Sequence, residues 1–121
     1  MENEIKSYKD LIVWQKSIKL VTLMYSFTNE FPKEEVYGLT SQLRRAVISI
    51  PSNIAEGKGR GSAKNYRSFL IIAQGSCYEV ETQLEISRQL NFGEEGKRQE
   101  IEALLIEVMK MLSTLITKLK P

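Results

Sequence analysis

The fold is decided by residues 39–61, which read LTSQLRRAVISIPSNIAEGKGRG. Apolar residues recur in this stretch at alternating spacings of three and four, which places them on one face of an α-helix. They are Leu39, Leu43, Ala46, Ile50 and Ile54. Pro51 lies inside the stretch, but the apolar rhythm continues through it. The sequence therefore predicts a kinked helix from residue 39 to about residue 56, not a chain reversal at the proline.

Three glycines within five residues, Gly57, Gly59 and Gly61, end this helix and predict a turn. Ser62 follows them and is well placed to cap a third helix, which we expect to end near Leu90. The apolar face of this third helix is Tyr66, Phe69, Leu70, Ala73, Cys77, Val80 and Leu84.

Two more helices flank this pair. The first is predicted over about residues 8–29 and ends before Phe31-Pro32, because a residue that precedes proline is pushed out of the helical region. Its expected core face is Leu11, Trp14, Ile18, Val21 and Tyr25. The fourth follows a turn at Asn91-Phe92-Gly93. Its apolar residues are Ile101, Leu104, Leu105, Val108, Leu112, Leu115, Ile116 and Leu119.

The order of elements predicts an all-α fold. No segment shows the two-residue alternation of a half-buried strand. Four helices of similar length joined by short loops favour antiparallel neighbours, and hence an up-and-down four-helix bundle. A chain of 121 residues fits one such domain, spanning residues 1–121.

The composition indicates which cellular compartment suits the protein. The chain has one cysteine, so an internal disulfide is impossible and a reducing compartment is suitable. The first ten residues are polar, and no apolar run approaches the roughly 20 residues that span a bilayer. We therefore expect a cytoplasmic protein with no signal peptide and no membrane contact.

The sequence gives little support for a catalytic site or a metal site. The chain contains no histidine, which removes Ser-His and Cys-His nucleophile pairs and the Glu-x-x-His metal sites of helical bundles. Cys77 falls on an apolar stripe, as a small core residue would. The glycines of residues 57–61 follow a helix, whereas a dinucleotide-binding loop follows a strand. We expect no enzyme activity, no cofactor and no metal site.

Basic residues gather in one third of the chain. Between Val36 and Arg67 there are six of them against one acidic residue, Glu56, although the whole chain carries a net charge of only +2. They are Arg44, Arg45, Lys58, Arg60, Lys64 and Arg67. Contacts with phosphate supply most non-specific affinity for nucleic acids, so these six are the candidate nucleic-acid-binding residues. The alternative is that they are solvated surface charges, with Arg44 or Arg45 paired to a glutamate.

The stretch from Ser49 to Gly57, SIPSNIAEG, strongly resembles the four-helix bundle family encoded in intervening sequences of bacterial 23S ribosomal RNA genes. Residues 11–15, 37–39, 60–69 and 73–81 agree with the same family. The resemblance implies a bundle that assembles into a ring-like homopentamer. It also implies a similarity to the accessory variability protein of diversity-generating retroelements, which binds nucleic acid and engages a reverse transcriptase.

Two functions follow from these observations. The first is a homopentamer that binds nucleic acid, with RNA favoured over DNA, through the basic residues. The alternative is a protein-interaction scaffold for a partner enzyme such as a reverse transcriptase. For the assembly, we expect apolar residues off the main stripe of the first helix to be partly exposed in one copy. These are Ile12, Val13, Leu20 and Phe27.

Overall fold

The computed structural model describes residues 4–120, which form four long helices. They are α1 (Ile12–Thr28), α2 (Leu39–Gly59), α3 (Ala63–Gln89) and α4 (Glu95–Lys118), with short 3₁₀ turns η1 (Tyr8–Asp10) and η2 (Lys33–Glu35). Residues 4–120 contain no strand, which confirms the prediction of an all-α protein with four helices. The predicted domain, residues 1–121, also includes residues 1–3 and 121, which lie outside the described residues.

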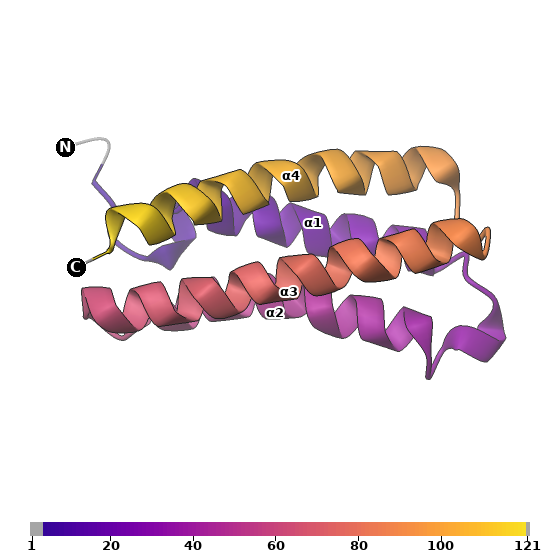
Figure 1. Cartoon of the computed structure of the whole chain (residues 1–121), viewed down its shortest axis with the longest axis horizontal. Helices are drawn as coiled ribbons and strands as arrows, with labels where there is room; N and C mark the ends of the chain where they lie inside the picture. Colours follow the sequence, from indigo (N-terminus) through magenta and orange to yellow (C-terminus); the bar gives the residue numbers. More distant parts are fainter. Residues whose placement is uncertain (1–3, 121) are drawn as a thin grey trace.

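Successive helices run in opposite directions and lie side by side (Figure 1). α1 packs against α2 and α4, and α3 packs against the same two helices. Figure 1 places the start of α1, the α2–α3 turn and the end of α4 at one end of the molecule. The connection from α1 to α2 and the α3–α4 turn lie at the other end.

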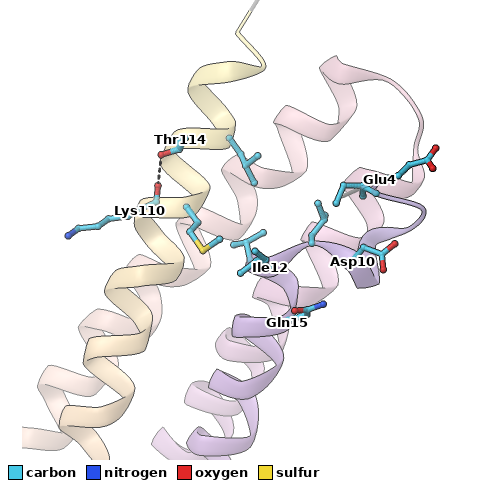
Figure 2. A pocket seen from close by; sticks show the side chains of 11 residues that line it. Glu4, Asp10, Ile12, Gln15, Lys110 and Thr114 are labelled. Atoms are coloured by element: carbon cyan, nitrogen blue, oxygen red, sulfur yellow. Dashed lines mark hydrogen bonds between the residues drawn. The ribbon is translucent and has the colours of Figure 1, made fainter. Parts of the chain in front are cut away.

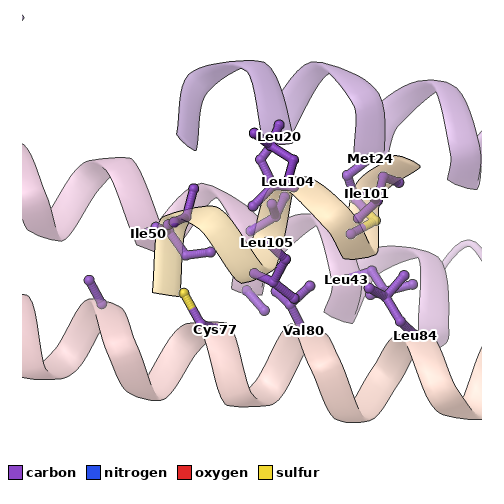
Figure 3. Packing of buried hydrophobic residues seen from close by; sticks show 14 of the residues in the cluster. Leu20, Met24, Leu43, Ile50, Cys77, Val80, Leu84, Ile101, Leu104 and Leu105 are labelled. Atoms are coloured by element: carbon purple, nitrogen blue, oxygen red, sulfur yellow. The ribbon is translucent and has the colours of Figure 1, made fainter. Parts of the chain in front are cut away.

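Side chains from all four helices meet in one core (Figure 3). The predicted face of the second helix is confirmed, because Leu43, Ile50 and Ile54 of α2 are fully buried. The predicted face of the third is confirmed except at Phe69, which is half-buried. Along α4 the predicted residues from Ile101 to Leu112 are buried, and those nearer its end pack against the core from its edge.

The predicted core face of α1 is correct only in part, because Leu11, Trp14 and Val21 are partly buried against the core but do not form its centre. The buried residues of α1 are Val13, Ser17, Leu20, Met24, Phe27 and Thr28. Ile18 and Tyr25, both predicted for the core, are 38% and 40% exposed. The expected exposure of the off-stripe residues is wrong too, because Val13, Leu20 and Phe27 are buried and Ile12 alone of the four is exposed.

The error has a physical cause. Helix α1 carries apolar residues around most of its circumference, so two stripes with helical spacing compete for the core. The stripe that is buried in the core contains Ser17, a polar residue that a prediction from sequence would place at the surface. Its hydroxyl donates a hydrogen bond to the Trp14 carbonyl at 2.8 Å, which removes most of the cost of burying it.

Helix α1 also begins at Ile12, four residues later than predicted. Ser7 and Asp10 form a capping box around η1, in which each side chain accepts a hydrogen bond from a backbone amide at the other end of the turn. Leu11 then takes an extended conformation, with ψ 125°, and separates η1 from α1.

Helix α2 continues through Pro51, as the rhythm predicts. Next to the proline, the Asn53 amide donates hydrogen bonds to the carbonyl and the hydroxyl of Ser49, at 2.8 and 2.9 Å. The Ser76 hydroxyl of α3 donates to the same Ser49 hydroxyl at 2.8 Å. These polar residues therefore reinforce the helix beside the proline and join α2 to α3.

The turn between α2 and α3 is shorter than the glycines suggest, because α2 extends to Gly59. Gly57 lies inside the helix for a packing reason: a Cβ there would lie 2.6 Å from the Phe69 Cβ and 3.2 Å from the Tyr66 carbonyl oxygen. Ser62 caps α3 as predicted, accepting a hydrogen bond from the Asn65 amide. The turn at residues 91–93 is confirmed as well, with Gly93 at φ 79°.

Within residues 4–120, no helix combines the length and the apolar character needed to cross a membrane.

The close approach at Gly57 yields a matched pair of variants. Gly57→Ala places a methyl group against Phe69 and should lower the free energy of unfolding by about 1–3 kcal/mol through overpacking. Gly59→Ala is the control, because a Cβ there meets nothing within 4 Å. It should leave stability unchanged or raise it slightly. Chemical denaturation of both variants measures the difference, and equal stabilities would contradict the packing described here.

Candidate nucleic-acid interface

The six basic residues singled out from the sequence lie in two separate places. Arg44 and Arg45 lie in the first half of α2, whereas Lys58, Arg60, Lys64 and Arg67 surround the α2–α3 turn. The 14 positions from Arg44 to Lys58 correspond to about 21 Å along a helix. The six residues therefore do not form one patch within a single copy of the chain.

Arg44 takes part in packing α1 against α2. Its Nε donates a hydrogen bond to the Thr28 hydroxyl at 2.9 Å, and its guanidinium lies 4.3 Å from the centre of the Tyr25 ring. Half-buried in this way, Arg44 is poorly placed to contact phosphate. The side chain of its neighbour Arg45 is exposed and forms no hydrogen bond or ion pair with another described residue.

The four basic side chains around the α2–α3 turn differ in how many contacts they make with the rest of the chain. The Lys58 ammonium lies 5.3 Å from the centre of the Tyr66 ring, an arrangement that leaves its charge unneutralised. Arg60 lies over the Phe69 ring and pairs with Glu56 at 2.7 Å. Arg67 donates from Nε to the Ile116 carbonyl at 3.1 Å, which satisfies one of the open carbonyls in the last turns of α4. Lys64 is exposed and free of such interactions within residues 4–120.

Sequence reasoning missed basic residues that the fold brings to the same end. The Arg67–Ile116 hydrogen bond places the end of α4 beside the start of α3, so Lys118 and Lys120 join the turn. We define the basic end as residues 4–11, 54–70 and 110–120, which contain nine basic residues and three acidic ones. The basic residues are Lys6, Lys9, Lys58, Arg60, Lys64, Arg67, Lys110, Lys118 and Lys120. The alternating direction of the helices was the signal that could have found them.

The opposite end of the molecule is acidic. Residues 28–46 and 79–102 contain ten acidic and six basic residues. Several of these charges neutralise one another in ion pairs, including Lys97 with Glu30 at 2.8 Å and Arg88 with Glu85 at 2.6 Å. The chain is therefore strongly polarised along its length, although its net charge is small.

An open groove of 680 Å³ lies at the basic end, between the N-terminal segment, the start of α1 and the last turns of α4. Apolar side chains make up most of its lining, namely Ile5, Leu11, Ile12, Val13, Met111 and Leu115. Figure 2 shows Lys110 on the α4 side of this groove, and Glu4 and Asp10 on the side of the N-terminal segment. The shape and lining suit an apolar side chain of a partner better than a phosphate.

The carboxylates of α3 and α4 do not form a metal site within residues 4–120. Glu107 pairs with Lys16, and Glu102 lies 3.8 Å from Arg98. Hydrogen bonds from Arg88 and then Gln89 hold the pKa of Glu85 at about 2, so this carboxylate stays ionised.

Cys77 is a buried core residue. Burial, with a smaller contribution from the charge of Glu81, raises the pKa of its thiol to about 12. A thiol in this state is a poor nucleophile, because the reactive species is the thiolate.

The comparison with protein families decides the classification. The model of the 23S rRNA-intervening sequence protein family matches residues 9–114 of this chain. The chain belongs to this family. The resemblance carried by the SIPSNIAEG stretch is therefore confirmed. The family match includes the four basic residues of the α2–α3 turn, whereas Lys118 and Lys120 lie beyond it.

A solved structure extends the likeness to three dimensions. The chain is similar to the crystal structure of a protein with unknown function from the S23 ribosomal protein family of Bacteroides thetaiotaomicron VPI-5482. The TM-score is 0.77 at 23% sequence identity, and the match covers 87% of this chain and 98% of the other. At this identity the likeness shows a shared fold. The search of curated proteins found no significant match.

Proposed function

We propose that this family member is a non-enzymatic, up-and-down four-helix bundle that assembles into a homopentamer and binds nucleic acid, with RNA favoured, through its basic end. The family is named for the genes of 23S ribosomal RNA, which makes RNA the first ligand to test. The cytoplasm, where RNA is abundant and thiols stay reduced, is the compartment that suits this role.

The concentration of open positive charge at the basic end carries the proposal. Of its nine basic residues, Arg60 is the one whose charge is paired with a carboxylate of the described chain. Phosphate contacts need lysine and arginine side chains that are free to reach the backbone of a nucleic acid. Lys64, Lys118 and Lys120 are exposed and meet this need. Arg44, by contrast, is engaged with Tyr25 and Thr28, so we exclude it from the phosphate contacts.

Assembly increases the effect of these charges. Copies arranged with their basic ends on the same side would produce a field several times that of one chain. The same end also carries the first turn of α3, where Lys64 lies beside backbone amides that have no partner within the helix.

The test is a double charge reversal, Lys64→Glu with Lys120→Glu. Binding to every RNA and DNA sequence should weaken alike, because phosphate contacts do not read bases. The slope of log affinity against log salt should become shallower by roughly 0.7–0.9 for each phosphate that a chain of the variant no longer neutralises. Fluorescence anisotropy over a salt series measures both quantities.

The control is Lys19→Glu with Lys33→Glu, which changes the net charge equally at exposed positions outside the basic end. This control should bind more tightly than the test variant and keep the parent's slope. Equally weakened binding in the two double variants would show that total charge alone governs affinity. A parent protein without measurable binding would overturn the proposal.

The groove at the basic end favours a second function, that of a scaffold for a protein partner such as a polymerase that acts on nucleic acid. Its predominantly apolar lining suits an apolar anchor. Binding through such an anchor should persist as salt rises, whereas phosphate binding weakens steeply. Ile12→Glu places a charge in the groove and should abolish partner binding while leaving affinity for nucleic acid in place.

A further inference from the structure

The outward face of α3 carries an apolar stripe. Ile71, Tyr78 and Ile86 follow helical spacing and are 46%, 54% and 44% exposed. They lie opposite the buried face of the helix, where Leu70 and Val80 enter the core. An outward helix face in a protein that works as a single copy is normally polar.

Gly75 lies in the middle of this stripe. Glycine is among the least favourable residues in a helix interior, and a Cβ at Gly75 would meet nothing within 4 Å. Packing within residues 4–120 therefore does not require a glycine at this position. Gly57 differs, because α2 and α3 approach each other too closely there for a side chain. A small residue at position 75 is explained if another chain packs closely against the stripe.

A second apolar face lies across α1 and α2. It consists of Trp14, Ile18, Val21 and Tyr25 of α1 together with Ile48 and Ala55 of α2. Ile18, Tyr25 and Ile48 are exposed, and the others are half-buried. The α1 part is the stripe that helical spacing alone assigns to the core. Packing within one copy therefore leaves much of the apolar surface of this stripe exposed to solvent.

The two faces occupy the same level along the bundle axis. Two side-chain hydrogen bonds fix the register of α2 against α3: Ser49 is level with Ser76, and Gln42 with Gln83. By this register Ile48 is level with Cys77, next to Tyr78. The approach of Arg44 to Tyr25 brings the α1 part of the first face to the same level.

Charged residues of opposite sign border the two faces, and they too lie at the same level along the bundle axis. Arg45 is level with Val80 of α3. Glu79 and Glu81 border the α3 stripe on opposite sides at this level, because residues two positions apart on a helix point in nearly opposite directions. All three charged residues are exposed, and none of their side chains forms a hydrogen bond or ion pair with another described residue. A free cation beside one apolar face and two free carboxylates beside the other, at one level, are complementary.

These features identify the occupant as a second copy of the chain. Rotation about an axis parallel to the bundle changes no residue's level, so faces at equal levels meet in a ring of parallel copies. Two different faces on one chain form a heterologous contact, which closes into a ring when the rotation permits.

We propose that the α1–α2 face of one copy packs against the α3 stripe of the next, in parallel orientation, with Arg45 at the level of Glu79 and Glu81, the carboxylates that border the stripe. This inference deepens the self-assembly part of the proposed function and rests on it. The parallel orientation brings every basic end to the same side of the ring. It also assigns Arg45 to the contact between copies and not to nucleic acid.

The first test is Gly75→Lys. The variant should fold at least as well as the parent, because lysine suits a helix better than glycine and the site is open. It should sediment as a monomer at concentrations where the parent is assembled, because a charged side chain then projects from the middle of the stripe. The control is Ala103→Lys on the exposed side of α4, which should assemble like the parent.

Assembly of folded Gly75→Lys equal to that of the parent would overturn the proposal, as would a monomeric parent at micromolar concentration. Sedimentation is measured without nucleic acid. A parent that assembles as expected but fails to bind nucleic acid would therefore contradict the proposed function while supporting this interface.

The second test reverses the charges. Arg45→Glu places like charges at the same level along the border of the contact and should raise the dissociation constant between copies about tenfold or more. Adding Glu79→Lys and Glu81→Lys to the same chain restores opposite charges and should restore assembly. A combined variant no better assembled than Arg45→Glu alone would place the contact elsewhere.

Discussion

The close packing of α2 against α3 is the constraint on which the rest of the molecule depends. Gly57 permits it, since any side chain there would collide with Phe69. Ser49 and Ser76 hold the same pair together at the level of the proline. Once these two helices are in register, α1 and α4 fit against them with the opposite directions that short connections impose. The ends of the four helices are then fixed relative to one another, and so are the charges near those ends.

Much of the fold follows from the sequence, because α2, α3 and α4 each carry one dominant apolar stripe. Leu43, Ile50 and Leu112 are buried where helical spacing places them. The core face of α1 could not be predicted, for the opposite reason. This helix is apolar on several sides, and spacing alone cannot tell which side faces the core. The side that carries Val13, Leu20 and Met24 is buried because it packs against the other helices. The local sequence pattern holds no information on that packing.

The candidate site could be predicted in part. The basic residues near the glycine turn were visible because they are close in sequence, and Lys58, Arg60 and Lys64 do lie together. Arg44 does not belong to this group, because it lies 14 positions before Lys58 on α2 and residues so far apart on a helix are at different levels. Lys118 and Lys120 were missed because only the fold brings the last turn of α4 beside the first turn of α3. The stripe with Gly75 was not predicted, because the burial of each residue was needed to separate its few apolar residues from the core face of α3.

The central claim is that parallel assembly gathers the basic ends and so creates the nucleic-acid-binding surface. The most direct test is the affinity of the folded Gly75→Lys variant for RNA over a series of salt concentrations. This substitution adds a positive charge to the chain, so weaker binding cannot be attributed to a smaller positive charge. If the assembly creates the binding surface, the monomeric variant binds far more weakly than the parent and with a shallower salt dependence. Equal affinity and an equal slope in a monomeric Gly75→Lys variant would contradict the claim.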